Sequence, residues 1–498
     1  MGTGPRGWGG PRLVAAVVGV ALVLVVWLLG TPPGGTPDEQ AHLIRGMSAA
    51  EGQWHGRAPS PPGPASNLAA EVTRSFTLPA RLNLLDKAPC YVQTTKTAAD
   101  CPTLFTLIHG RARSHVGAYF PLAYVPLGLA ELSASNPAAA DYYGRAVSAG
   151  WCLALLGLGF ACTRRRRERI AWFAGFLPIT AFAATAAATN GIEVCGALAL
   201  AAGALGVHRD RGRAGAWAVV AGGISLAIAK DGGPFFLAAE AVLLTLAARG
   251  LSWIPRLGPA RIGAWAAPVA GAVANLVWTV FFGRNPVTGT QTPLSSSHLH
   301  HEVWQALGGF PRQVFTQFGW ADTYVPDWVV ILGWTCAGVV LLLLALRARG
   351  RGVLVAVLGL VVVFLATTAF AVIEIRGSFG LQGRYTLAAI VPLALYACLA
   401  ERRPDRTPGA LLRAGGAVLG LAATGLVVLT GMSALTNLRR NAVGPNGSWR
   451  LADASWAGPG GNTLLLALLA AACAVLLVTV LAGRDPRPTA PVDPRTPG

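Results

Sequence analysis

The feature that most restricts the fold of this chain is the recurrence of apolar runs long enough to cross a lipid bilayer. A membrane-spanning helix needs about 20 mostly apolar residues, because the hydrocarbon core is about 30 Å thick. Runs of this kind begin near residues 13, 139, 171, 192, 214, 234, 262, 328, 353, 385, 411 and 463. Helices satisfy their own backbone hydrogen bonds in lipid, so we expect an all-α polytopic protein with about 12 transmembrane helices.

Composition agrees with this prediction and excludes several other classes of protein. Hydrophobic residues make up 53% of the chain and charged residues only 12%, against roughly 25% charged in ordinary soluble domains. A soluble enzyme, a disordered chain and a disulfide-stapled secreted domain are therefore excluded. The net charge of +18 is spread between apolar runs and does not form the single basic surface of a nucleic-acid binder. We expect one integral membrane domain over residues 1–498, with the bilayer and not nucleic acid as its partner.

The arginines predict how the chain is oriented. They cluster in short segments between the runs, for example at residues 164–169, 209–213, 347–351 and 402–413. Short loops rich in Arg and Lys stay on the cytoplasmic side, which puts both termini in the cytoplasm. The first run, Leu13 to Gly30, is longer than a signal-peptide core and is not followed by a small-residue cleavage site. We therefore expect it to remain as an anchor.

This orientation leaves three longer segments on the extracytoplasmic side. They cover residues 31–139, 283–327 and 432–462, while residues 483–498 form a cytoplasmic tail. Within the first, Tyr119–Ser133 is apolar but short and contains two prolines, which indicates a helix lying at the membrane interface. Long loops are usually functional or disordered, so chemistry is to be sought outside the cytoplasm.

The sequence PDEQAH at residues 37–42 is the strongest local motif. Thr36 as N-cap with Glu39 three residues later forms a capping box, and this structural role alone would explain Thr36, Pro37 and Glu39. It does not explain Asp38 and His42, which are four residues apart and share one helix face. Together they could hold a hydroxyl group or a divalent metal such as Mg or Mn.

The cysteines suggest one disulfide. Most of the eight lie in or beside predicted spans and read as small apolar packing residues. Cys90 and Cys101 both lie in the first extracytoplasmic segment. In an oxidising compartment a bridge between them is expected.

Four motifs together resemble a bacterial membrane family known as domain of unknown function 2142. They are PDEQAH at 37–42 followed by Arg45, YFPLAY at 119–124, NGIE at 190–193 and QGRY at 382–385, in the family's order. The chain departs from the family pattern at Gly191, where a proline is common, and at Glu193, where an aspartate is often found. These departures concern the role of that turn, whereas the ordered set supports membership.

The family is similar to C-type (GT-C) glycosyltransferases, which implies a GT-C-like fold with interfacial helices in a large first extracytoplasmic loop. The resemblance implies a bacterial plasma-membrane enzyme that takes a sugar from a polyprenyl phosphate and adds it to a cell-envelope glycan or lipid. It also implies essential acids in the first extracytoplasmic loop, where Asp38 lies.

Glycosyl transfer from a lipid phosphate needs a base for the acceptor hydroxyl and a cation for the departing phosphate. We assign Asp38 as general base or metal ligand with His42, and leave Glu39 either assisting or only capping. Arg384 suits the phosphate because guanidinium binds phosphate bidentately, with Arg376 and Lys230 as alternatives. Five further residues are predicted to bind substrate: Tyr124, Asn190, Glu193, Gln382 and Tyr385.

The alternative is a transporter or flippase for a lipid-linked or small polar substrate. About 12 spans with both termini inside would suit a transporter, but transporters place polar groups near the bilayer midplane. Here the acids fall mainly outside the runs, and Glu240 is the main exception. The enzyme interpretation is therefore favoured.

Overall fold

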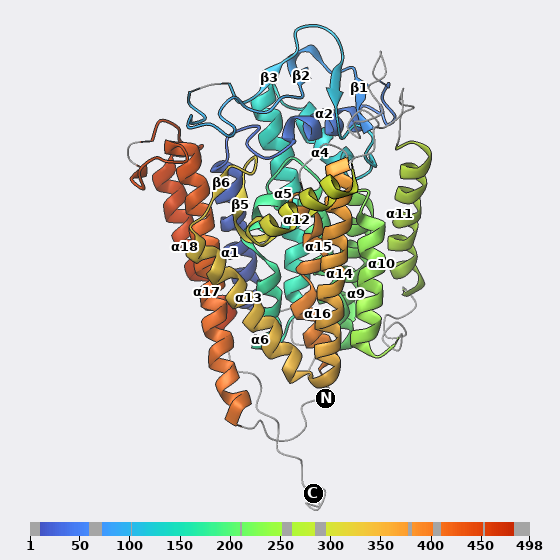
Figure 1. Ribbon diagram of the computed structural model, residues 1–498, viewed down its shortest axis with the longest axis vertical. Helices are drawn as coiled ribbons and strands as arrows, with labels where there is room; N and C mark the ends of the chain where they lie inside the picture. Colours follow the sequence, from blue (N-terminus) through green and yellow to red (C-terminus); the bar gives the residue numbers. More distant parts are fainter. Residues whose placement is uncertain are drawn as a thin grey trace, which may run out of the picture.

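The structure is a computed structural model of the whole chain. It describes residues 10–58, 72–100, 102–209, 212–250, 261–283, 295–376, 381–401, 410–451 and 454–482. Most of these residues are helical, and the long helices form a bundle capped at one end by loops and short strands (Figure 1).

Among the described residues, eight helical segments are long and apolar enough to cross a membrane, as expected of a polytopic membrane protein. These candidate spans are Gly10–Leu29 in α1, Pro137–Ala161 (α5), Asn190–His208 (α8), Asp327–Arg347 (α13), Arg349–Ile373 in α14, Gly383–Ala400, Gly415–Val443 in α17 and Asn462–Leu481 (α18). Three shorter apolar segments join them: Arg213–Ala229 in α9 (Gly212–Ala229), α10 (Gly233–Ala248) and Ala266–Phe281 in α11 (Arg261–Phe281). Helices α14 and α17 extend in full over Arg349–Arg376 and Ala410–Val443.

Helix α8 lies at the centre of the bundle, and nearly all of its residues are buried. Small residues let its backbone approach α9 closely. A Cβ on Gly196 would lie 2.8 Å from the carbonyl oxygen of Gly222, and one on Gly203 would lie 2.7 Å from the amide nitrogen of Val219. Helix α9 is therefore fixed against α8, and with it the turn that follows α9.

Two of the predicted runs are broken helices. The run near residue 171 folds into α6 (Arg166–Gly175) and α7 (Pro178–Ala184), and Pro178 begins the second piece. The run near 385 folds into the 3₁₀ helix η3 (Gly383–Thr386), α15 (Leu387–Ile390) and α16 (Leu393–Ala400), interrupted at Pro392. Proline lacks the amide proton that a continuous helix requires. A prediction from hydropathy alone therefore treats as one helix two segments that the backbone separates.

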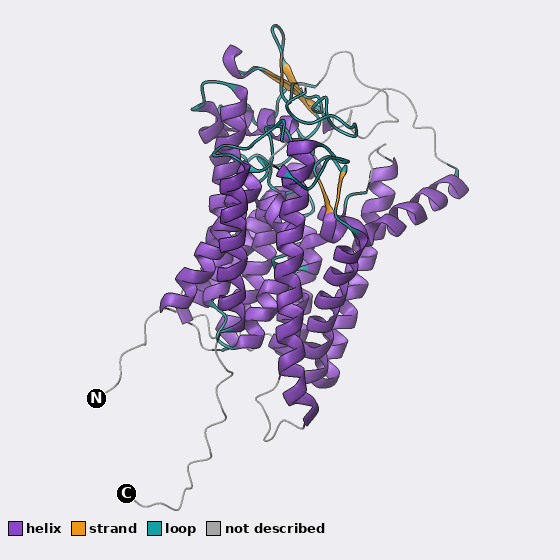
Figure 2. Cartoon of the chain, turned by 90° about the vertical axis from the view of Figure 1, so that its left-hand side faces the viewer, coloured by secondary structure: helices purple, strands orange, loops and turns teal. Residues whose placement is uncertain are grey.

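The loop-rich end of the bundle adds short strands that an all-α prediction does not include (Figure 2). Strand β1 (Arg74–Phe76) pairs antiparallel with β4 (Ala112–Ser114), with Arg74 opposite Ser114. Strand β2 (Leu84–Leu85) pairs with β3 (Phe105–Thr106), and β5 (Gln317–Phe318) with β6 (Thr323–Tyr324). The other elements at this end are α2 (Glu39–Ala50), η1 (Ala80–Leu82) and α4 (Val125–Leu132), which lies inside the predicted interfacial segment.

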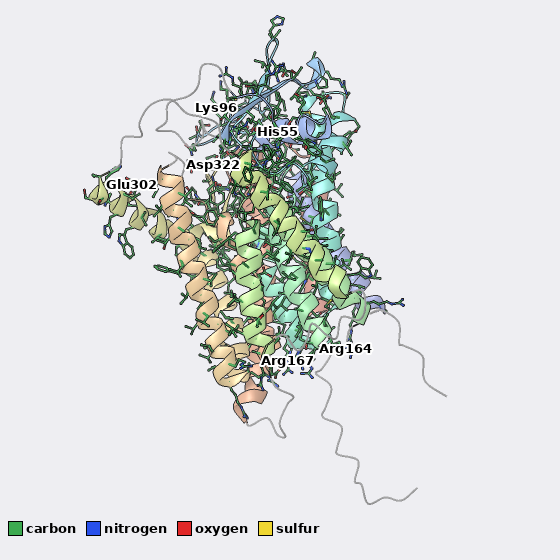
Figure 3. The ribbon with its side chains drawn as sticks, turned by 90° about the vertical axis from the view of Figure 1, so that its right-hand side faces the viewer. His55, Lys96, Arg164, Arg167, Glu302 and Asp322 are labelled. Atoms are coloured by element: carbon green, nitrogen blue, oxygen red, sulfur yellow. The ribbon has the colours of Figure 1, made fainter. Side chains whose placement is uncertain are left out.

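The loop-rich end has a small apolar core of its own. Leu43, Ile44 and Met47 of α2 are buried there with Phe76 and Leu82. Helix α12 (Ser296–Thr316) runs crosswise to the long helices (Figure 1). The labelled residues His55, Lys96 and Asp322 lie towards the loop-rich end of the bundle, whereas Arg164 and Arg167 lie at the opposite, arginine-rich end (Figure 3).

Candidate functional site

A cavity of about 460 Å³ brings together residues that are far apart in the sequence. Its lining comes from α2, α8, the α9–α10 turn, the end of α14 and the segment that enters η3. Seven predicted site residues line it: Asp38, His42, Asn190, Lys230, Gln382, Arg384 and Tyr385. All four sequence motifs thus contribute lining residues at one place, the second of them through Tyr119.

The backbone at Asp38 determines where its carboxylate points. Helix α2 begins at Glu39, so Asp38 and not Thr36 is the N-cap, and Asp38 makes no side-chain capping bond. Of the predicted capping box, the bond from the Thr36 amide to Glu39 Oε2 is present at 3.2 Å. Asp38 adopts a left-handed conformation with φ of 62°, which Asp tolerates better than most residues. Its side chain faces the cavity instead of the helix terminus.

Two cationic side chains contact the Asp38 carboxylate. Arg384 donates from Nη2 to Oδ2 at 2.8 Å, and His115 Nε2 lies 3.5 Å from Oδ1. Burial would raise the pKa of Asp38, but the hydrogen bond from His115 and the charges of Arg384 and His115 outweigh it and hold that pKa well below its usual range. Asp38 is therefore a carboxylate throughout the physiological range. The Nε of Arg384 is buried and has no hydrogen-bond partner among the described residues.

His115 is a site residue that the sequence analysis missed. Its Nδ1 lies 2.7 Å from Oδ2 of Asp86, so the imidazole bridges Asp86 and Asp38. Burial alone would lower the pKa of His115. Its hydrogen bonds to Asp38 and Asp86 outweigh this effect and raise the pKa to about 10. His115 is thus a cation at neutral pH. Its proximity to Asp38, 77 positions earlier in the chain, could not be read from spacing.

His42 is held in the opposite protonation state. Its Nδ1 lies 2.7 Å from the hydroxyl of Tyr124, and the two rings stack at 5.8 Å. Burial lowers the pKa of His42 to about 3, and the positive charges of Arg384, His115 and Lys230 act in the same direction. His42 is therefore neutral at physiological pH. Tyr124 is fully buried and reaches the site through His42.

Glu39 lies away from the cavity. Its carboxylate forms an ion pair with Arg145 at 2.5 Å, and both side chains are fully buried. It also accepts the amide proton of Ala187 at 3.1 Å, while Arg145 contacts Asp141 at 3.0 Å. These bonds give Glu39 a structural role outside the cavity, and we propose no catalytic role for it.

The turn between α9 and α10 supplies Lys230 and Asp231 to the cavity. Asn275 of α11 fixes this turn by donating to the carbonyl oxygens of Ala227 and Lys230, each at 2.8 Å. The Lys230 ammonium lies 4.1 Å from the ring centre of Tyr385. Asp231 is a second site residue that the predicted set does not contain. Its neighbour Lys230 is the signal that could have led to it.

The other predicted residues have different placements. Glu193 lies one turn into α8 from Asn190 and is buried without lining the cavity. Helix α14 ends at Arg376, whose side chain lies outside the described part of the structure. Cys90 is disulfide-bonded, and Cys101, its predicted partner, lies outside the described residues.

The residues at Asp38 and His42 do not fit the suggested divalent metal. Among the described residues, no group of three or more His, Cys, Asp or Glu side chains could hold a metal ion. The positive charges of Arg384 and His115 already engage both oxygens of Asp38, and they would repel a metal cation. We therefore derive no step through a metal.

Part of the cavity lining is apolar. It is formed by Phe235 of α10 and by Ala366, Ala369, Phe370 and Ile373 of α14. Phe235 is 52% exposed and Ile373 is 50% exposed. The cavity is therefore lined by charged and by apolar side chains together.

Comparison with protein families agrees with the motifs. Residues 21–395 match the family described as "Predicted membrane protein (DUF2142)". No curated protein and no solved structure compared with the chain gives a match. The matched region includes Asp38, Tyr124, Asn190 and Arg384 and covers most of the chain. The chain belongs to the DUF2142 family of membrane proteins.

Proposed function

We propose that this protein is a membrane glycosyltransferase with a GT-C-like fold. It transfers a sugar from a polyprenyl phosphate to a glycan or lipid of the cell envelope. The observation that carries this proposal is that one cavity is lined both by the cations Arg384 and Lys230 and by apolar side chains of α10 and α14. Polyprenyl phosphates have the matching combination, a phosphate on a long hydrocarbon chain.

The positive charges of Arg384 and Lys230 suit the phosphate that leaves during transfer. Arg384 offers a planar set of donors, and its buried Nε has no partner among the described residues. Lys230 adds a second positive charge in the same cavity. Fixed positive charges aimed at the leaving oxygen stabilise the charge that develops there. Asp38 holds Arg384 in place through the 2.8 Å ion pair.

The charge distribution supports an extracytoplasmic site in a bacterial plasma membrane. At the arginine-rich end, Arg167 and Arg347 contact Glu401 at 2.6 and 3.1 Å, and further arginines surround them. Lys and Arg concentrate on the cytoplasmic side of membrane proteins. This orientation puts the termini inside and the cavity at the outer membrane face, where lipid-linked sugars meet envelope acceptors.

A transporter or flippase is the alternative function. The one observation in its favour is Glu240, which is 2% exposed within α10, because ionisable groups inside the membrane often mark a substrate path. The charged groups of the cavity lie instead in the loop-rich end and in the α9–α10 turn. That placement favours chemistry at the membrane surface over passage through its midplane.

The test uses the full chain in lipid nanodiscs with a panel of polyprenyl-phosphate monosaccharides and envelope lipid extract. We expect release of free polyprenyl phosphate and a labelled sugar on the acceptor. Arg384→Gln should reduce both products, whereas Asp327→Asn, an acid-to-amide change at an exposed position, should leave them unchanged. In sealed proteoliposomes, movement of intact donor across the bilayer without loss of its sugar would establish the transporter and refute the enzyme.

A further inference from the structure

Asp231 has the geometry of a reactive carboxylate. It lies in the turn between α9 and α10, which Asn275 fixes through the carbonyl oxygen of Lys230. It lines the same cavity as Arg384 and Tyr385. Its Oδ1 atom is buried and has no hydrogen-bond partner among the described residues. A carboxylate oxygen that is positioned but unpartnered is free to accept a proton from a bound hydroxyl group.

Asp38, the sequence-based choice for the base, is less suited to that task. One of its oxygens accepts from Arg384 and the other faces His115. These two cations keep its pKa well below the usual range. A general base works best when its pKa lies near the working pH, so a carboxylate stabilised in this way takes up a proton poorly.

The surroundings of Asp231, in contrast, raise its pKa. Burial raises the pKa of Asp231. The charges of Lys230 and Arg45 and the backbone hydrogen bond of Phe120 offset only part of this increase, so the pKa is about 6. Glu193 of α8 also lies within electrostatic range of Asp231. The resulting pKa is close to neutral pH. Asp231 is therefore ionised in most molecules at pH 7 and is still basic enough to accept a proton.

We propose that Asp231 is the general base of this site and that Asp38 is a positioning residue for Arg384 and His115. This inference rests on the proposed transferase function. The acceptor oxygen forms a bond to the anomeric carbon of the sugar, and its proton passes to the Asp231 carboxylate. The bond from that carbon to the phosphate oxygen breaks, and the polyprenyl phosphate leaves with the electron pair beside Arg384 and Lys230.

The experiment compares Asp231→Asn with wild type and with the matched control Asp327→Asn, using the full chain in nanodiscs. Asp231→Asn should lower kcat about 10²- to 10⁴-fold, the usual contribution of general base catalysis. Affinity for polyprenyl phosphate alone should stay within about threefold, because the phosphate ligands remain. Asp327→Asn should match wild type in both measurements. Retained phosphate affinity also shows that the Asp231→Asn protein is folded.

The pH profile separates a base from a structural residue. In wild type, kcat should fall below about pH 6 as Asp231 becomes protonated. Asp231→Glu should recover part of the rate and move this limb, whereas Asp231→Asn should remove it. If Asp231→Asn keeps at least a tenth of kcat while Asp38→Asn abolishes turnover, the assignment is overturned and the transferase stands. If wild type turns over no donor, both proposals are overturned.

Discussion

Two neighbouring acids of the same motif have opposite environments. Glu39 and Arg145 form an ion pair with both side chains fully buried, next to Asp141. Asp38 and Arg384 form an ion pair whose side chains are 24% and 10% exposed and line the cavity. The first pair is enclosed by protein on every side, and the second can exchange a partner with a ligand that enters.

The difference shows how adjacent charges can serve stability and function separately. Arg145 also donates to the carbonyl oxygens of Thr31 and Pro32 at 2.7 and 2.8 Å, so it joins the end of α1 to α5. No space is left there for substrate. Arg384 keeps a buried donor without a described partner. The closed pair should therefore control folding, and the open pair should control binding.

The largest effect should come from breaking the closed pair. Arg145→Met leaves the Glu39 and Asp141 carboxyl groups buried without their cation, and removal of one partner of a buried pair costs about 3–5 kcal/mol. We expect the free energy of unfolding in detergent, measured by denaturant titration, to fall by this amount. Asp327→Asn breaks an exposed pair with Arg312 and should change it by less than about 1 kcal/mol. Equal effects of the two variants would remove the distinction between closed and open pairs.

The next effect concerns the open pair. Arg384→Gln removes a charged donor from the cavity but keeps a side chain of similar polarity. Charge-assisted hydrogen bonds contribute about 1.5–3 kcal/mol each, so the Kd for polyprenyl phosphate should rise about 10- to 100-fold. Isothermal titration with the lipid phosphate measures this change. The free energy of unfolding should fall much less than in Arg145→Met. An unchanged Kd would show that the phosphate does not bind at Arg384.

Apolar runs were sufficient to predict the membrane bundle, because bilayer thickness sets the length of each run. They did not reveal the broken helices at Pro178 and Pro392, since each run is apolar on both sides of its proline. They also gave no indication of the short strands, whose two or three residues are held by contacts within the loop-rich end. Hydropathy thus predicts what lipid requires, whereas it says little about backbone shaped by neighbouring protein.

The motifs supply seven of the 20 residues that line the cavity, but they could not separate Asp38 from Glu39. That separation depends on the left-handed backbone at Asp38, which turns its side chain away from that of Glu39. His115 and Asp86 were missed for a different reason. They lie 29 positions apart in a loop without helical spacing, and only the folding of that loop brings them to Asp38.

His115 provides the last of the predicted effects and tests how the open pair is held. Its pKa is raised to about 10 in the folded protein, above an ordinary value near 6.5. Protonated His115 therefore stabilises the fold fully below about pH 6.5, and this contribution disappears as the pH rises through 10. His115→Gln should lower the free energy of unfolding at pH 6, where His115 of the folded wild type carries its proton. The difference from wild type should vanish near pH 10.5.

In an NMR titration, Asp86→Asn should lower the pKa of His115 by removing one of its two carboxylates. A His115 that titrates near 6.5 in both proteins would mean that it does not bridge Asp86 and Asp38, and the open pair would then depend on Arg384 alone.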